Sequence, residues 1–143
     1  MLMLTTSLKT LRYCVEDDEV SMDFLKIILA ESHTLYTANN GAESIKICKD
    51  NPDIDLVLMD MKMPVMDGFE ATKKIRLSNK DVIIIAQTAY GLSGDREKAI
   101  ESGCNDYVSK PIVKNVLFSK IDEYFTIKLN LKKFKNGIKS KEI

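Results

Sequence analysis

Four polar groups suited to phosphoryl chemistry each follow an apolar stretch of β-strand character. They are the acidic run Glu16-Asp17-Asp18, Asp60, Thr88 and Lys110. The carboxyl ends of parallel strands open on one edge of a sheet, so these groups are expected to converge there. A carboxylate such as Asp60 can attack phosphorus and form an acyl phosphate. Because phosphoryl transfer requires little beyond positioning and neutralisation of charge, the set predicts a site that accepts a phosphoryl group on Asp60.

The remaining members of the set have complementary roles. Crowded carboxylates repel one another and need a cation, and oxygen ligands without Cys or His favour a hard ion. Mg²⁺ fits best beside phosphate, and Mn²⁺ is expected to substitute for it. Lys110 supplies a compact positive charge for a phosphoryl oxygen, and Thr88 supplies a hydroxyl that donates to another. Each feature alone has a plainer explanation as a solvated loop or a turn residue, but their joint occurrence at four strand ends favours a phosphoryl site.

Five strands and five helices are expected to alternate along the chain and to position these groups. The strands are expected at 11–15, 34–37, 56–59, 82–86 and 107–108, and the helices at about 21–31, 42–49, 69–78, 93–102 and 112–125. The alternation predicts an α/β fold with a doubly wound parallel sheet and helices on both faces. Either Ser93 or Asp95 is expected to cap the fourth helix, and Gly103 to end it. The buried face of the last helix is expected to carry Ile112, Val116, Leu117, Ile121 and Phe125.

Length and composition indicate one domain in a reducing compartment. A chain of 143 residues, 45% of them hydrophobic, is large enough for a single core. No apolar run of 20 residues could span a bilayer, and the N-terminal Met1–Leu4 lacks the basic flank of a secretory signal. The three cysteines show no CxxC spacing. They therefore argue against disulfides and a zinc site, and for a cytoplasmic protein.

Residues 1–9 show no hydrophobic period and are expected to be a disordered lead-in, followed by a domain at 10–126 and a basic tail at 127–143. The tail holds six lysines and one glutamate, so it carries a charge of +5 and the rest of the chain carries −5. An acidic domain argues against a nucleic-acid surface. The tail is expected to be a solvated or frayed end, with contact to an anionic partner as the alternative.

Over about residues 10–125 the chain resembles the receiver domain of two-component signalling. The matching pieces are Val15-Glu16-Asp17-Asp18-Glu19, Leu58-Met59-Asp60-Met61-Lys62-Met63-Pro64-Val65-Met66-Asp67-Gly68, Thr88-Ala89, Gly103-Cys104-Asn105-Asp106-Tyr107 and Ser109-Lys110-Pro111. The resemblance implies a flavodoxin-like sheet with strand order 2-1-3-4-5. It also implies that Asp60 receives its phosphoryl group from a histidine of a histidine kinase or of a histidine phosphotransfer protein, and that the domain then switches conformation.

The same resemblance implies roles for individual residues around Asp60. Asp17 would ligate Mg²⁺ directly, Glu16 would help through water, and the backbone carbonyl of Lys62 would complete the set with Asp60. Lys110 would pair with the phosphoryl group, and the bond before Pro111 would be cis.

Thr88 and Tyr107 correspond to the switch pair of such domains. In that pair the hydroxyl moves to the phosphoryl group and the aromatic ring turns inward. A plain edge-strand aromatic is the alternative for Tyr107. Homodimer formation on phosphorylation is a further expectation, and membrane contact is not expected.

The amino-acid sequences of these motifs are most similar to those of receivers attached to hybrid histidine kinases. The sequence leaves open whether the domain is excised from such a kinase or stands alone. A Mg²⁺-dependent phosphohydrolase of the haloacid-dehalogenase class is the enzymatic alternative, but its acid/base Asp would fall at Lys62. A degenerate receiver that acts only as a binding module, without accepting a phosphoryl group, would lack the counterpart of Asp60, Thr88 or Lys110. All three residues are present in this chain. We therefore expect a signalling phosphoacceptor rather than an enzyme. Its autodephosphorylation should be slow, because Lys62 and Tyr90 are poorly suited to orienting water.

Overall fold

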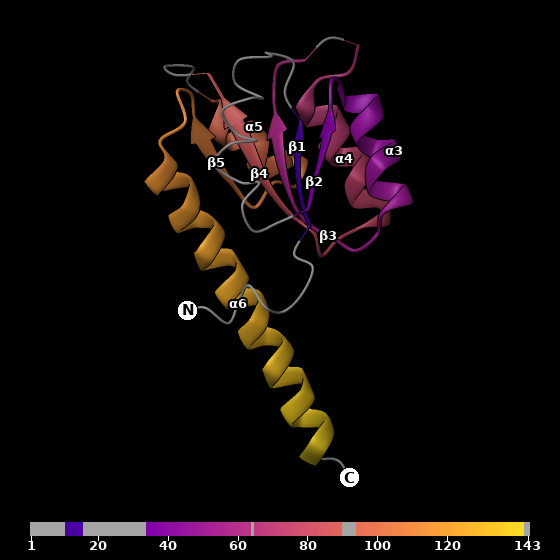
Figure 1. The fold of residues 1–143 in the computed structure, drawn as a ribbon, viewed down its shortest axis with the longest axis vertical. Helices are drawn as coiled ribbons and strands as arrows, with labels where there is room; N and C mark the ends of the chain where they lie inside the picture. The colour runs from indigo at the N-terminus through magenta and orange to yellow at the C-terminus, as the bar shows by residue number, and fades with distance from the viewer. Residues whose placement is uncertain (1–10, 16–33, 64, 90–93, 142–143) are drawn as a thin grey trace. The chain divides into compact units, whose positions relative to one another are not determined.

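The computed structural model describes residues 11–15, 34–63, 65–89 and 94–141 (Figure 1). The expected helix at 21–31 lies outside the described residues, as do the acidic run at 16–18 and Tyr90. The chain divides into two compact units, Met1–Pro111 and Ile112–Ile143.

The first unit contains a five-stranded parallel sheet. Its strands are β1 (Leu11–Val15), β2 (Thr34–Ala38), β3 (Ile54–Asp60), β4 (Ile83–Thr88) and β5 (Asp106–Ser109). Their order is β2-β1-β3-β4-β5, and every neighbouring pair is parallel. This order confirms the predicted fold class. The side chains of β4 are all buried, as are those of β3 except the second, which is why these strands are nearly continuous apolar runs in the sequence.

Three helices of this unit are described: α3 (Gly41–Asp50), α4 (Gly68–Ser78) and α5 (Asp95–Ser102). Asn40 and Asp67 cap α3 and α4 by accepting hydrogen bonds from backbone N–H groups, each at 2.9 Å. The expectation that Asp95 could cap α5 was wrong, because Gly94 is the N-cap and makes no side-chain cap; Ser93 lies outside the described residues. Gly103 ends α5 with φ 114°, as expected for a residue in the left-handed region.

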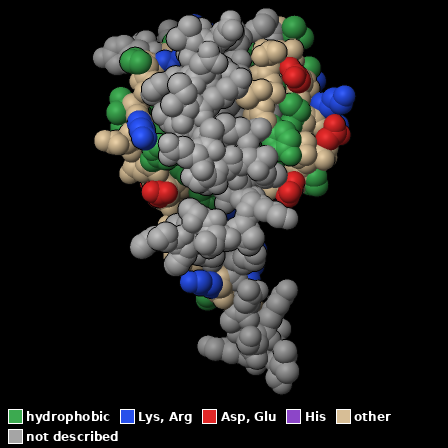
Figure 2. Space-filling view, in the orientation of Figure 1, with side chains coloured by type: hydrophobic (Ala, Val, Ile, Leu, Met, Phe, Trp, Pro, Cys, Tyr) green, Lys and Arg blue, Asp and Glu red, His purple; other side chains and the backbone are tan. Residues whose placement is uncertain are grey.

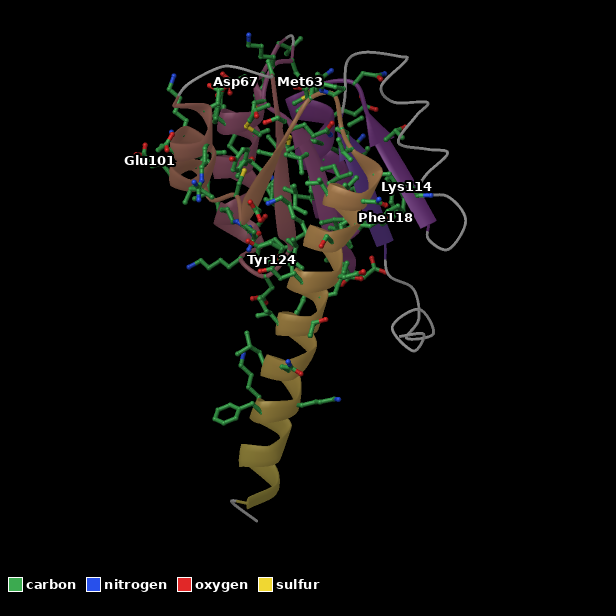
Figure 3. The ribbon with its side chains drawn as sticks, turned by 90° about the vertical axis from the view of Figure 1, so that its left-hand side faces the viewer. Met63, Asp67, Glu101, Lys114, Phe118 and Tyr124 are labelled. Atoms are coloured by element: carbon green, nitrogen blue, oxygen red, sulfur yellow. The ribbon has the colours of Figure 1, made fainter. Side chains whose placement is uncertain are left out.

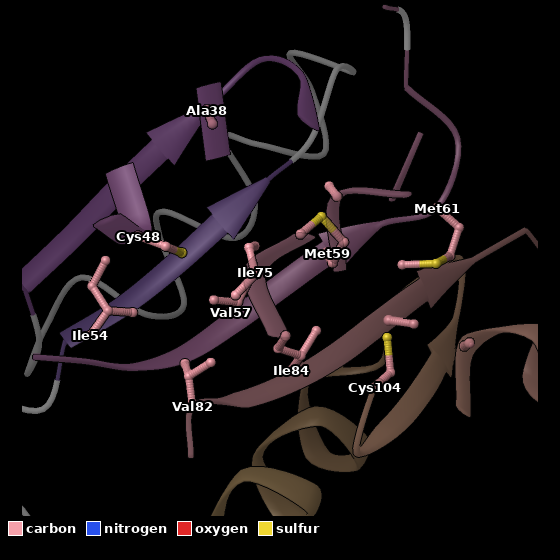
Figure 4. Packing of buried hydrophobic residues seen from close by; sticks show 13 residues of the cluster. Ala38, Cys48, Ile54, Val57, Met59, Met61, Ile75, Val82, Ile84 and Cys104 are labelled. Atoms are coloured by element: carbon pink, nitrogen blue, oxygen red, sulfur yellow. The ribbon is translucent and has the colours of Figure 1, made fainter. Parts of the chain in front are cut away.

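The core lies between the sheet and these three helices (Figure 4). Val57 and Met59 of β3 and Ile84 of β4 form the sheet side of the cluster. The helices contribute Cys48, Ala71, Ile75 and Ala99. Two cysteines, Cys48 and Cys104, are buried in this cluster with free thiols.

Alkaline pH is expected to weaken the fold through these two thiols. Burial raises the pKa of Cys48 and of Cys104 from 9.0 to about 11. Between pH 9 and pH 11 the unfolded chain therefore loses thiol protons that the folded chain keeps, so the free energy of unfolding falls as the pH rises. Two pKa units correspond to roughly 2.7 kcal/mol for each thiol.

Urea unfolding at pH 8 and pH 11 measures this effect. The free energy of unfolding should fall between pH 8 and pH 11 in both proteins. The fall should be smaller by a few kcal/mol in a Cys48→Ala/Cys104→Ala variant than in the parent. Cavities left by the substitutions lower stability at both pH values and cancel in the comparison. An equal fall in parent and variant would show that these thiols titrate normally.

The second unit consists of a single long helix, α6 (Lys114–Lys141), preceded by residues 112–113. The expected helix at 112–125 was therefore placed two residues early and ended too soon. Residues 127–141 contain no proline and one glycine, so nothing in them stops a helix. Of the expected buried face, Leu117 and Ile121 are buried and Phe125 is half-buried, whereas Val116 is exposed and Ile112 precedes the helix. Within α6 the Lys114 ammonium lies 5.7 Å from the centre of the Phe118 ring (Figure 3). None of the described helices is both long enough and apolar enough to cross a membrane.

Candidate functional site

Asp60 is a buried carboxylate held by two donors at the end of the central strand. It is the last residue of β3 and is 3% exposed. Its Oδ2 accepts a hydrogen bond from the Lys110 ammonium at 3.0 Å, and its Oδ1 accepts one from the backbone N–H of Lys62, also at 3.0 Å. The Lys110 side chain is 30% exposed, so this ion pair lies at the mouth of the site rather than deep in the core.

Backbone pairing brings Lys110 to Asp60 from two strands away. The Lys110 N–H donates to the carbonyl oxygen of Thr88 at 2.8 Å, which extends the pairing of β4 with β5 by one bond. The Lys110–Pro111 bond is cis, as the resemblance implies. Thr88 is buried and is the last residue of β4, whereas the sequence placed it in the loop after the strand. The structure thus brings Asp60 and Lys110 into contact and places Thr88 at the same edge.

The loop after Asp60 closes tightly on the strand end. Met61 N donates to Gln87 O at 3.1 Å, and Gly68 N donates to Met61 O at 3.1 Å. A Cβ on Gly68 would overlap the Asp60 carbonyl oxygen and lie 2.8 Å from Met61 Cα, so only glycine fits there. Met63 and Asp67 lie at this same end of the first unit (Figure 3). The Lys62 side chain is exposed, and it is the backbone of Lys62 that contacts Asp60.

Tyr107 lies in the edge strand β5, with its ring half-buried against the core cluster. The Arg96 guanidinium lies 5.6 Å from the centre of the ring, a cation–π distance. Both interpretations of Tyr107, switch residue and edge-strand aromatic, fit this placement. Its role in a switch stays a prediction.

The sequence offers oxygen ligands that the structure describes only in part. Glu16 and Asp17 lie outside the described residues, so the structure does not bear on their proximity to Asp60. Among the residues that it does describe, no three acidic, Cys or His side chains lie close enough to hold a metal ion.

Gln87, beside the site, and Arg76, at the opposite edge of the sheet, were not singled out from the sequence. Gln87 is fully buried and is the Cα partner of Asp60 in the neighbouring strand. It could have been noticed as the one amide in the run Ile83–Thr88. Arg76 makes four hydrogen bonds, two to the turn that leads into β5 and two to the segment between α4 and β4. Nothing in the sequence separates Arg76 from an exposed basic residue at the end of a helix.

Known proteins match nearly the whole of the described first unit. The family model of the response regulator receiver domain matches residues 13–122. Hybrid signal transduction histidine kinase G of Dictyostelium discoideum is 38% identical over 121 residues, which cover 80% of this chain and 4% of the kinase. Chemotaxis protein CheY of Halobacterium salinarum is 34% identical over 113 residues, which cover 78% of this chain and 93% of that protein. The chain therefore spans a small part of the kinase but nearly all of the chemotaxis protein.

Two solved structures share both fold and sequence with this chain. The receiver domain of Ssk1 from Saccharomyces cerevisiae, solved with the histidine phosphotransfer protein Ypd1, matches with a TM-score of 0.77 and 34% identity, covering 84% of this chain and 91% of that one. The receiver domain of sensor histidine kinase PA1611 from Pseudomonas aeruginosa matches with a TM-score of 0.75 and 29% identity, covering 83% and 99%. That domain was solved with a magnesium ion coordinated in its active site cleft.

Proposed function

This chain belongs to the family of response regulator receiver domains of two-component signalling, and we propose that Asp60 is its phosphoacceptor. The observation that carries the proposal is the contact of the buried Asp60 carboxylate with the Lys110 ammonium at 3.0 Å. We propose a phosphorylated histidine of a histidine kinase or of a histidine phosphotransfer protein as the donor. The complex of the Ssk1 receiver domain with Ypd1 supports the second kind of partner.

The chemistry is a transfer between two nucleophiles. A carboxylate oxygen of Asp60 bonds to phosphorus, the phosphorus–nitrogen bond of the donor breaks, and its electron pair stays on the imidazole nitrogen. Lys110 neutralises charge on the phosphoryl oxygens, which is most of what such a transfer needs from a protein. The Thr88 hydroxyl donates to another of these oxygens. We propose that this donation, together with a rotation of the Tyr107 ring, forms the conformational switch.

The donor set of the site suits a hard divalent cation. Asp60 and the Lys62 carbonyl offer oxygen donors, and Glu16 and Asp17 follow β1, the strand that pairs with β3. We propose that these residues hold Mg²⁺, with Mn²⁺ able to replace it. The magnesium ion in the similar PA1611 domain supports this assignment. When bound, the ion offsets the negative charge that would repel an incoming phosphoryl group.

Phosphotransfer to the purified chain tests the proposed function. A histidine phosphotransfer protein, phosphorylated beforehand on its histidine, is mixed with the chain and Mg²⁺. The chain should gain the mass of one phosphoryl group, and chelation of the metal with EDTA should prevent the gain. Hydrolysis should then remove the phosphoryl group slowly, because the exposed Lys62 side chain is poorly suited to orienting the attacking water. Failure of several such donors and of acetyl phosphate to label the chain would contradict the proposal.

We also propose a cytosolic setting, with proteins rather than nucleic acid or membrane as partners. The buried free thiols of Cys48 and Cys104 suit a reducing compartment. Acidic and basic side chains are mixed on the described part of the face in Figure 2, whereas a nucleic-acid surface is usually a basic patch.

We infer that a second copy of this chain binds along the C-terminal half of α6. Ile127, Leu131 and Phe134 are 48%, 56% and 66% exposed on that helix. In the sequence this 3-4 spacing runs from Tyr124 to Ile138, which is the pattern of the seam of a coiled coil.

The charges beside this seam favour two parallel helices. In a parallel pair, Glu123 would face Lys128 of the other copy, and Asn130 would face Lys135. An antiparallel pair would instead set lysine against lysine. We therefore propose a parallel homodimer, favoured further when Asp60 is phosphorylated.

Sedimentation equilibrium measures this association with and without acetyl phosphate. The parent should sediment increasingly as a dimer as its concentration rises, and Leu131→Asp should remain a monomer. Thr126→Asp, an exposed position off the seam, is the matched control and should dimerise like the parent. A parent that stays monomeric in both conditions would rule the dimer out.

A further inference from the structure

Gln87 is a buried polar side chain beside the phosphoacceptor. It is fully buried, and among the residues that the structure describes neither its Nε2 nor its Oε1 has a hydrogen-bond partner. An amide buried without partners costs stability that an apolar side chain of similar shape does not. Because the great majority of buried polar side chains are paired, this one calls for an explanation.

The register of the sheet places Gln87 next to Asp60. The two residues are Cα partners in the pairing of β3 with β4, and Gln87 O accepts a hydrogen bond from Met61 N at 3.1 Å. Side chains of such partners lie on the same face of a sheet whose strands are about 4.8 Å apart. A glutamine side chain is longer than this spacing between strands, so the register places Asp60 within its reach.

Lys110 reaches Asp60 from just beyond the end of β5. Val108 is the partner of Gln87 across β4 and β5, and Lys110 follows two positions later. Because β4 lies between β3 and β5, the Lys110 side chain crosses the end of β4 to reach Asp60. In this state the Lys110 ammonium and the Lys62 N–H hold the two oxygens of Asp60. Gln87 is adjacent to the pair but bonded to neither member.

We propose that Gln87 is a positioning residue whose amide gains a hydrogen bond when Asp60 carries a phosphoryl group. The inference rests on the proposed function of Asp60. The phosphoryl oxygens draw the Lys110 ammonium away from the carboxyl group. The Gln87 Nε2 then donates to the Asp60 oxygen that is not bonded to phosphorus, and no covalent bond of Gln87 changes. The Gln87 amide is hydrogen-bonded in the phosphorylated state and unpaired in the unmodified state. Gln87 therefore stabilises the phosphorylated state relative to the unmodified one.

Gln87→Met tests this exchange of partners, because methionine has a similar length and no amide. In the unmodified protein the substitution removes an unpaired amide, so the melting temperature should rise by about 3–6 °C. Beryllium fluoride with Mg²⁺ serves as the mimic of the acyl phosphate. The variant should bind it about 5- to 20-fold more weakly than the parent, since the hydrogen bond of that state is lost.

Ile85→Met is the matched control, because Ile85 lies two positions earlier on the same face of β4 and is fully buried. Its melting temperature reports the repacking of methionine, and its affinity for beryllium fluoride should equal that of the parent. If Gln87→Met binds beryllium fluoride like the parent, or melts below the Ile85→Met control, the inference is wrong while the proposed function stands. If the parent itself is not stabilised by beryllium fluoride, the proposed function fails and the inference with it.

Discussion

Asp60→Asn is expected to abolish phosphorylation, reducing the rate of labelling by at least about 100-fold. The amide of asparagine has no anionic oxygen to attack phosphorus. In addition, the substitution leaves the Lys110 ammonium without the carboxylate that lies 3.0 Å away in the parent. The measurement is the intact mass of the protein after incubation with Mg²⁺ and a phosphorylated histidine phosphotransfer protein.

Asp67→Asn is the matched control for this substitution. Asp67 lies at the same end of the first unit (Figure 3) and caps α4 through its carboxylate, a task that asparagine performs equally well. The control should therefore fold normally and be labelled at the rate of the parent. If Asp60→Asn were labelled as fast as Asp67→Asn, another residue would be the acceptor.

The predictable part of this fold is the part in which one physical pattern dominates. The runs ending in Asp60 and Thr88 are apolar throughout, and strands buried on both faces require that composition. Their ends were placed one or two residues short, because polar residues were assigned to the loops. In the structure Asp60 and Thr88 are the last residues of their strands. Pairing with the next strand, rather than polarity, decides where a strand ends.

Other features depend on contacts between residues far apart in the sequence. The contact of Lys110 with Asp60 could be anticipated because all parallel strands end at one edge. The burial of Gln87 could not be anticipated, because the residues next to it belong to strands β3 and β5, which are distant in sequence. The length of α6 was missed for a different reason. A run of lysines suggested a frayed end, yet lysine is a good helix former and nothing after Ile127 interrupts the helix.

Arg76 is the residue on which the sequence was least informative, and its guanidinium joins three segments of the first unit. Nε donates to Gly103 O at 2.8 Å, and Nη1 donates to Val82 O at 2.7 Å and to Asn79 O at 3.3 Å. Nη2 donates to Asn105 Oδ1 at 2.8 Å, and the same oxygen accepts from Ile84 N. Burial lowers the pKa of Arg76, while Cys104 and Asp81 act in the opposite direction. The end of α4, the start of β4 and the turn before β5 thus depend on one side chain.

Arg76→Ala is expected to lower the free energy of unfolding by about 3 kcal/mol and the melting temperature by about 10 °C. The carbonyl oxygens of Gly103 and Val82 lose a charged donor, and water reaches them only partly. Arg76→Lys should recover less than half of the loss, because a single ammonium cannot reproduce the fork of the guanidinium. Lys73→Ala, an exposed position on the same helix, is the control and should melt within about 1–2 °C of the parent. The measurement is the melting temperature of the parent and the three variants. If Arg76→Ala melted at the same temperature as the control, these hydrogen bonds would add nothing to stability.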